Sequence, residues 1–145
     1  MFRRVILTAL CVLLVCGLTV QAMQDSANEN DKKALQGKWE VVSVVQGGKE
    51  GKVPKMCVVS FDGGNLTCTP KMGDFSEFSF TIDASKAPKA LDLKSKDDSL
   101  VGIFELKGDH LNLCFFDGEP VTKNRPKEFA STERTTLMVL KRVKK

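Results

Sequence analysis

The stretch GIFELKGDHLNLCFF, residues 102–116, decides the fold because it contains a complete β-hairpin. Gly108 stands at the first central position of a two-residue turn, where glycine favours a type II′ hairpin. With Gly108 and Asp109 as the turn, Phe104 pairs with Leu113, and the apolar residues of both strands share one face. A slip of one residue would turn this whole face to solvent, so the sequence predicts a single register.

The same alternation of apolar and polar residues recurs along the chain between turn residues. Strands that follow one another at intervals of about eight to twelve residues are typical of sandwiches and barrels. A second hairpin is centred on DGGN, residues 62–65, with either Asp62-Gly63 or Gly63-Gly64 as its turn. We count about eight to nine strands, and pairing the last with the first would remove the exposed edges. The sequence therefore predicts an all-β, antiparallel meander barrel over residues 37–145.

The first 22 residues are typical of a secretory signal peptide. They contain Arg3 and Arg4 near the start, continue as an apolar run, and end at Ala22 in a small-residue cleavage pattern. The run over residues 5–20 is shorter than the roughly 20 residues that span a bilayer, which favours cleavage over a retained anchor. We expect an exported protein, periplasmic or extracellular, without membrane attachment after cleavage.

Residues 23–36 form a polar lead before the barrel, and no apolar periodicity is evident in it. Asp31 could cap a short helical turn that ends at Leu35, so we expect a flexible lead with one such turn. The formal net charge of the chain is +4, with both signs interspersed. Because nucleic-acid binders gather their basic residues on one face, the sequence predicts no nucleic-acid partner.

Three cysteines, Cys57, Cys68 and Cys114, come after the predicted signal peptide. The second hairpin places Cys57 and Cys68 opposite or diagonal to each other, where a disulfide could form in an oxidising compartment. The alternative is that both are small buried side chains. The chain has one His and no CxxC pair, so we predict neither a metal site nor a cofactor.

Several motifs together resemble a family of small lipocalin-like domains abundant in planctomycetes. In chain order they are LQGKW at 35–39, VVS at 41–43, GIFELKGDHL at 102–111, LC at 113–114, RPxxF at 125–129 and VLKR at 139–142. The likeness covers about residues 31–143 and implies a lipocalin-like barrel without implying an activity. It also implies that Trp39 plugs the closed end of the barrel under Arg142 or, as the less favoured alternative, under Arg125.

Few residues favour catalysis. His110 lies beside the predicted turn on an exposed face, and Cys114 is about 13 Å further along the same strand, too far for a nucleophile and its base. No hydrolase, zinc-protease or phosphate-loop motif is present. Loop carboxylates could act as an acid and base pair, but such residues more often form turns; they are Asp97 with Asp98, and Asp117 with Glu119. We predict a non-enzymatic protein, with a hydrolase as the less favoured alternative.

Two kinds of binding remain open. A small apolar ligand, or a self-packed core, could fill the barrel among the predicted inward residues Trp39, Val41, Phe61, Phe78, Phe80, Phe104, Leu113 and Phe115. A protein partner could bind an outward apolar patch, unless a loop covers it; the patch consists of Val101, Ile103 and Phe116, with Val42 and Val44 also facing outward. We expect a secreted lipocalin-like binding or interaction module, and a carrier of a small apolar ligand as the alternative.

Overall fold

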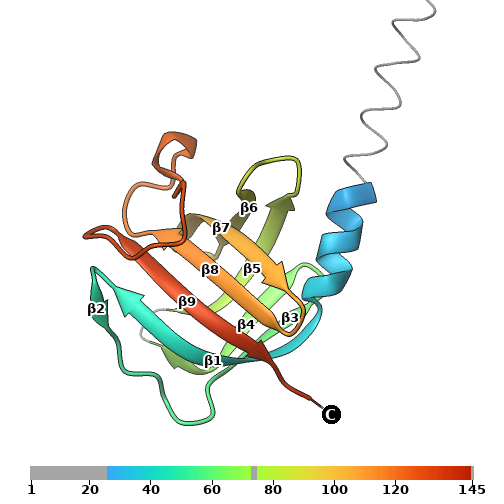
Figure 1. The fold of residues 1–145 in the computed structure, drawn as a ribbon, viewed down its shortest axis with the longest axis horizontal. Coiled ribbons are helices and arrows are strands. Elements are labelled where there is room, and N and C mark those ends of the chain that lie inside the picture. Colours follow the sequence, from blue (N-terminus) through green and yellow to red (C-terminus); the bar gives the residue numbers. More distant parts are fainter. Residues whose placement is uncertain (1–25, 73–74, 145) are drawn as a thin grey trace, which may run out of the picture.

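The computed structural model describes residues 26–72 and 75–144 of the chain (Figure 1). The predicted signal peptide, residues 1–22, lies outside the described residues. Within these residues, no helix combines the length and the apolar character that crossing a bilayer requires.

Eight antiparallel strands form a closed barrel, and one short strand is added beside β1 (Figure 1). The strands are β1 (Gly37–Gln46), β2 (Lys49–Glu50), β3 (Val58–Asp62), β4 (Asn65–Met72), β5 (Phe75–Asp83), β6 (Lys89–Lys94), β7 (Ser99–Lys107), β8 (His110–Phe116) and β9 (Thr135–Arg142). From β3 to β9 each strand pairs with the next in sequence, and β1 pairs with both β3 and β9. The predicted all-β meander barrel is therefore confirmed.

The two predicted hairpins have defined registers. In β7 and β8, Phe104 pairs with Leu113 around the Gly108-Asp109 turn, as predicted. In β3 and β4, Asp62 pairs with Asn65, so the turn is Gly63-Gly64. Gly63 has a φ of 60°, a left-handed conformation that glycine adopts without steric cost. Cys68 therefore lies opposite Val59 and diagonal to Cys57.

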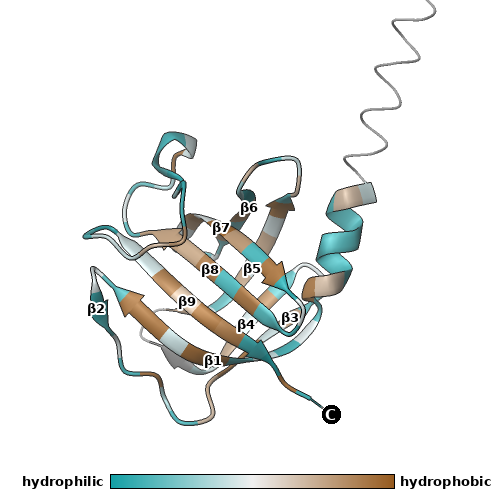
Figure 2. Cartoon of the chain, in the orientation of Figure 1, coloured by the Kyte–Doolittle hydropathy of each residue, from teal (hydrophilic) through white to brown (hydrophobic). Residues whose placement is uncertain are grey.

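The polar lead contains a longer helix than the sequence predicts. Residues 26–35 are helical, rather than the single turn expected from Asp31 to Leu35. The helix is largely hydrophilic in Figure 2, and polar contacts to the barrel fasten it. Asn28 Oδ1 accepts a hydrogen bond of 2.7 Å from the Ala84 N–H, and Asp31 forms a 2.6 Å ion pair with Lys89. Apolar periodicity could not reveal this helix because only its last residue is buried in the core.

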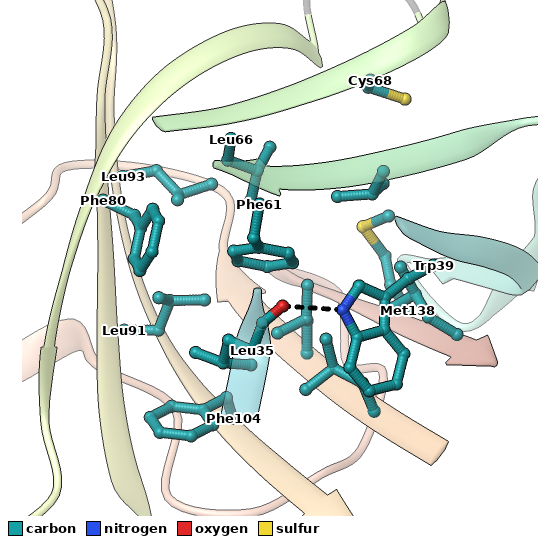
Figure 3. Close-up of a cluster of buried hydrophobic side chains, with 14 of the residues drawn as sticks. Leu35, Trp39, Phe61, Leu66, Cys68, Phe80, Leu91, Leu93, Phe104 and Met138 are labelled. Atoms are coloured by element: carbon teal, nitrogen blue, oxygen red, sulfur yellow. Dashed lines mark hydrogen bonds between the residues drawn. The ribbon is translucent and has the colours of Figure 1, made fainter. Parts of the chain in front are cut away.

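The closed end of the barrel is built around Trp39. Its indole is fully buried, and Nε1 donates a 2.9 Å hydrogen bond to the Leu35 carbonyl at the end of the helix (Figure 3). The Arg142 guanidinium lies 4.1 Å from the Trp39 ring centroid. It also donates hydrogen bonds to the carbonyls of Ala34 at 2.7 Å and Gln36 at 3.1 Å. Arg142 thus covers the Trp, as the resemblance implies.

Cations are favourable beside the carboxyl end of a helix, where carbonyl groups lack partners within the helix. Arg142 supplies both the charge and the hydrogen-bond donors at this end. The alternative prediction, that Arg125 covers Trp39, is wrong because the Arg125 guanidinium pairs with Asp92. One guanidinium therefore joins the last strand, the first strand and the helix.

We predict that Arg142→Ala lowers the free energy of unfolding by about 2–4 kcal/mol. The change removes the cation–π contact and leaves two backbone carbonyls without donors. Urea unfolding followed by Trp39 fluorescence measures it. Lys141→Ala, an exposed neighbour on the same strand, is the control and should change stability by less than about 0.5 kcal/mol. Equal stability of the two variants would contradict the role given to Arg142.

Candidate functional site

The barrel interior next to Trp39 is packed with side chains. All eight residues predicted to face inward are buried, and all belong to one hydrophobic cluster. Figure 3 shows Trp39, Phe61, Phe80 and Phe104 among the Leu side chains that fill this half. This part of the predicted ligand site is therefore filled by the hydrophobic core of the protein.

A cavity of about 390 Å³ lies at the other end of the barrel, the end at which β1 finishes. We call it the mouth cavity. Its apolar wall consists of Val44, Phe75, Phe78, Leu100, Phe115 and Met138, and its polar lining consists of Gln46, Asp98, Asp117 and Thr136. Of the eight predicted interior residues, Phe78 and Phe115 alone line it. Its volume is within the range of small-molecule sites.

A second, larger hollow of about 850 Å³ has a different character. It lies on the outward face of β5 and β6 and around the loop between β6 and β7, and most of its lining is polar, including Glu77, Ser79, Lys94 and Asp97. Small-molecule sites are mostly apolar, with a few placed polar groups. By this criterion the smaller mouth cavity is the better candidate.

Aromatic rings form one side of the mouth cavity. The Phe75 ring centroid lies 5.2 Å from that of Phe78 and 6.3 Å from that of Phe115. Gly102 makes room for the Phe115 ring, because a Cβ at this position would lie 2.5 Å from both Phe115 Cδ1 and the Cys114 carbonyl oxygen. The glycine in the predicted hairpin therefore positions a wall residue of the cavity.

A β-bulge brings Val44 into the cavity. The pairing of β1 with β9 shifts register between Val41 and Ser43, so that Val44 pairs with Met138. Strict alternation from Val41 would turn Val44 outward, and that prediction is wrong because the extra residue of a bulge reverses the facing of the later residues in the strand. Val42 does face outward and is exposed. The sequence carries no clear signal for this bulge.

Two carboxylates from different loops line the mouth cavity. Asp98 precedes β7 and Asp117 follows β8. Asp117 Oδ2 accepts a 2.7 Å hydrogen bond from the Thr136 hydroxyl, and Asp98 Oδ1 accepts a 2.8 Å bond from the Ser99 N–H. Among the ion pairs of the described residues, none includes either carboxylate. The mouth cavity therefore has a negatively charged rim.

The sequence suggests different carboxylate pairs. Asp97 and its expected partner Asp98 both line the outer hollow, but of the two only Asp98 also lines the mouth cavity. Glu119, the expected partner of Asp117, is exposed and does not line the cavity either. Of these four carboxylates, Asp98 and Asp117 are the two that line the mouth cavity, where the pairing of β7 with β8 places the loop before β7 beside the loop after β8.

Two of the three residues of the predicted outward patch are buried. Val101 is 6% exposed and Ile103 is 0% exposed, while Phe116 is half-buried. Residues 117–134, the covering loop, connect β8 to β9 and contact this face: the Cys114 thiol donates to the Ala130 carbonyl at 3.6 Å. The prediction of an exposed partner surface at Val101 and Ile103 is therefore wrong, because the loop provides the cover.

Arg125 fastens the covering loop to the barrel wall. It donates to Asp92 Oδ1 at 2.6 Å, to Asp92 Oδ2 at 3.2 Å and to the Gly102 carbonyl at 2.8 Å. Two hydrogen bonds to one carboxylate fix both the position and the orientation of the guanidinium. The following Pro126 is buried. The RPxxF motif thus anchors the loop over β6 and β7.

The remaining reactive groups are separated. His110 is exposed at the closed end of the barrel, beside the β7–β8 turn. Cys114 lies under the covering loop, and burial raises the pKa of its thiol, which lowers its thiolate fraction at neutral pH. Across residues 26–72 and 75–144, no group of three or more His, Cys, Asp or Glu side chains is arranged to hold a metal ion.

We predict that Arg125→Ala releases the covering loop. Binding of an apolar dye should rise as Val101 and Ile103 become accessible, and the free energy of unfolding should fall by about 1–3 kcal/mol because Asp92 and the Gly102 carbonyl lose their donor. Lys127→Ala, at an exposed position of the same loop, is the matched control. Unchanged dye binding and stability in Arg125→Ala would show that other contacts hold the loop.

Comparison with known proteins adds no functional information. No family model, no curated protein and no solved structure matches this chain. The resemblance to lipocalin-like domains stays a prediction.

Proposed function

We propose that this protein is a non-enzymatic binding module that holds one small molecule in the mouth of its barrel. The mouth cavity carries the proposal, because it offers an apolar, partly aromatic wall with a few polar groups at its rim. The core cluster that contains Trp39 fills the other half of the barrel. The ligand would therefore enter only the open half of the barrel.

The lining favours a ligand with an apolar body and a cationic head. Phe75, Phe78 and Phe115 offer aromatic faces and edges to the body. Asp98 and Asp117 supply carboxylates at the rim, and an ammonium group carries three donors for such acceptors. An anionic head would be repelled at the same rim. We therefore propose an amphipathic amine as the ligand class.

This proposal favours the small-ligand alternative over a protein partner. The outward patch that suggested a protein partner is covered by residues 117–134. Export to the periplasm or the exterior is part of the proposal and rests on residues 1–22. A binding module in such a compartment would meet small amphipathic molecules directly.

We predict that octylamine binds the protein more tightly than octanol and much more tightly than octanoate. Isothermal titration calorimetry on the purified protein measures the three affinities. The double variant Asp98→Asn/Asp117→Asn should lose about tenfold or more in octylamine affinity, equivalent to about 1.4 kcal/mol, and little in octanol affinity. Val44→Phe, which places a larger side chain in the mouth cavity, should weaken both ligands.

Asp97→Asn is the matched control, because it removes a neighbouring carboxylate outside the mouth cavity. It should leave octylamine affinity unchanged. Urea unfolding of each variant confirms that the barrel remains folded. Equal effects of Asp97→Asn and the double variant would contradict the charged rim, and binding that is insensitive to Val44→Phe would contradict the mouth cavity as the site.

A further inference from the structure

Two thiols meet inside the barrel near its wall. The Sγ atoms of Cys57 and Cys68 lie 3.5 Å apart, and the side chains are buried, with exposures of 1% and 5%. Both sulfurs also approach the Pro70 carbonyl oxygen, at 3.6 Å from Cys57 and 3.5 Å from Cys68. The two thiols therefore lie between the loop before β3 and the middle of β4.

We propose that Cys57 and Cys68 are an oxidation site at which an intramolecular disulfide forms. A disulfide has an S–S distance of about 2.05 Å, so the sulfurs must approach by about 1.5 Å. Cys68 pairs with Val59 of β3, and it lies in the part of β4, between Thr67 and Met72, where the pairing with β5 is irregular. The proposal is independent of the ligand proposed for the mouth cavity.

The local structure indicates which thiol reacts first. Cys57 lies at the end of the segment 51–57, outside a regular strand, and its neighbour Met56 is 85% exposed. Cys68 lies within β4, where its partner on β3 is Val59. A local opening of residues 51–57 would expose Cys57 without separating β3 from β4. Cys57 is therefore the attacking thiol.

The oxidant is a disulfide of the glutathione class. The Cys57 thiolate attacks one of its sulfurs, forms a mixed disulfide and releases one thiol. The Cys68 thiolate then attacks Cys57 Sγ and releases the second thiol. In total, two protein thiols are oxidised to one disulfide, and one small disulfide is reduced to two thiols with both protons transferred to them.

Cys114 supplies an internal control. It lies on the outward side of β8 under the covering loop, whereas Cys57 and Cys68 belong to the core cluster inside the barrel. Its thiol is bonded to the Ala130 carbonyl, and its pKa is raised by burial. A Cys114→Ser variant should leave the oxidation of the other two cysteines unchanged.

The sequence also provides a direct assay. Trypsin cleaves after Lys55 and Lys71, so Cys57 and Cys68 share the fragment MCVVSFDGGNLTCTPK, residues 56–71, while Cys114 is on the fragment 108–123. The full chain is equilibrated in a series of reduced-to-oxidised glutathione ratios, both as the native protein and during refolding. It is then blocked with N-ethylmaleimide in denaturant and digested.

We predict that fragment 56–71 loses about 2 Da and takes up no maleimide under oxidising conditions, in both the original chain and Cys114→Ser. It should take up two maleimides after reduction with dithiothreitol. Cys57→Ser and Cys68→Ser should each leave one reactive thiol in this fragment. The proposal is overturned if the fragment keeps two reactive thiols during both procedures, retains glutathione as the end product, or becomes linked to fragment 108–123.

Discussion

The contact between Arg142 and the Trp39 indole is the interaction on which the rest of the structure depends. Barrel closure requires β9 to pair with β1, and in that pairing Arg142 stands opposite Trp39. The same guanidinium donates to the Ala34 carbonyl in the last turn of the N-terminal helix and to the Gln36 carbonyl just after it. Because Trp39 Nε1 also donates to Leu35, the helix, the first strand and the last strand are joined at one buried site. The interior of the closed end is consequently filled by side chains, and the ligand that we propose would bind at the other end.

The mouth cavity exists because the inner side chains do not fill the barrel along its whole length. A small barrel of eight strands has an interior just wide enough for its own side chains or for one small ligand. Here both solutions occur in one barrel: core residues occupy the half next to Trp39, and a cavity remains where β1 ends. The bulge after Val41 and the missing side chain of Gly102 shape this half, by turning Val44 inward and by admitting the Phe115 ring.

The covering loop changes the functional interpretation of the outer wall. Val101 and Ile103 are apolar residues on the outward face of β7, whose inward face is apolar as well. A strand that is apolar on both faces is typical either of a partner surface or of a wall covered by its own chain. In this protein the chain covers its own wall, because Arg125 of the covering loop pairs with Asp92 of β6. Little apolar surface remains in this region for a protein partner, and the mouth cavity becomes the better-supported site.

Local alternation and turn chemistry were sufficient to predict the barrel, the register of residues 102–116 and the burial of the eight inward residues, because strand facing has a period of two and depends directly on residue order. The helix over residues 26–35, the bulge after Val41 and the cover over Ile103 were decided only by the tertiary structure. Each depends on contacts between residues far apart in the chain, such as Asp31 with Lys89 and Arg125 with Asp92. The rim of Asp98 and Asp117 has the same origin, since two loops become neighbours only when their strands pair.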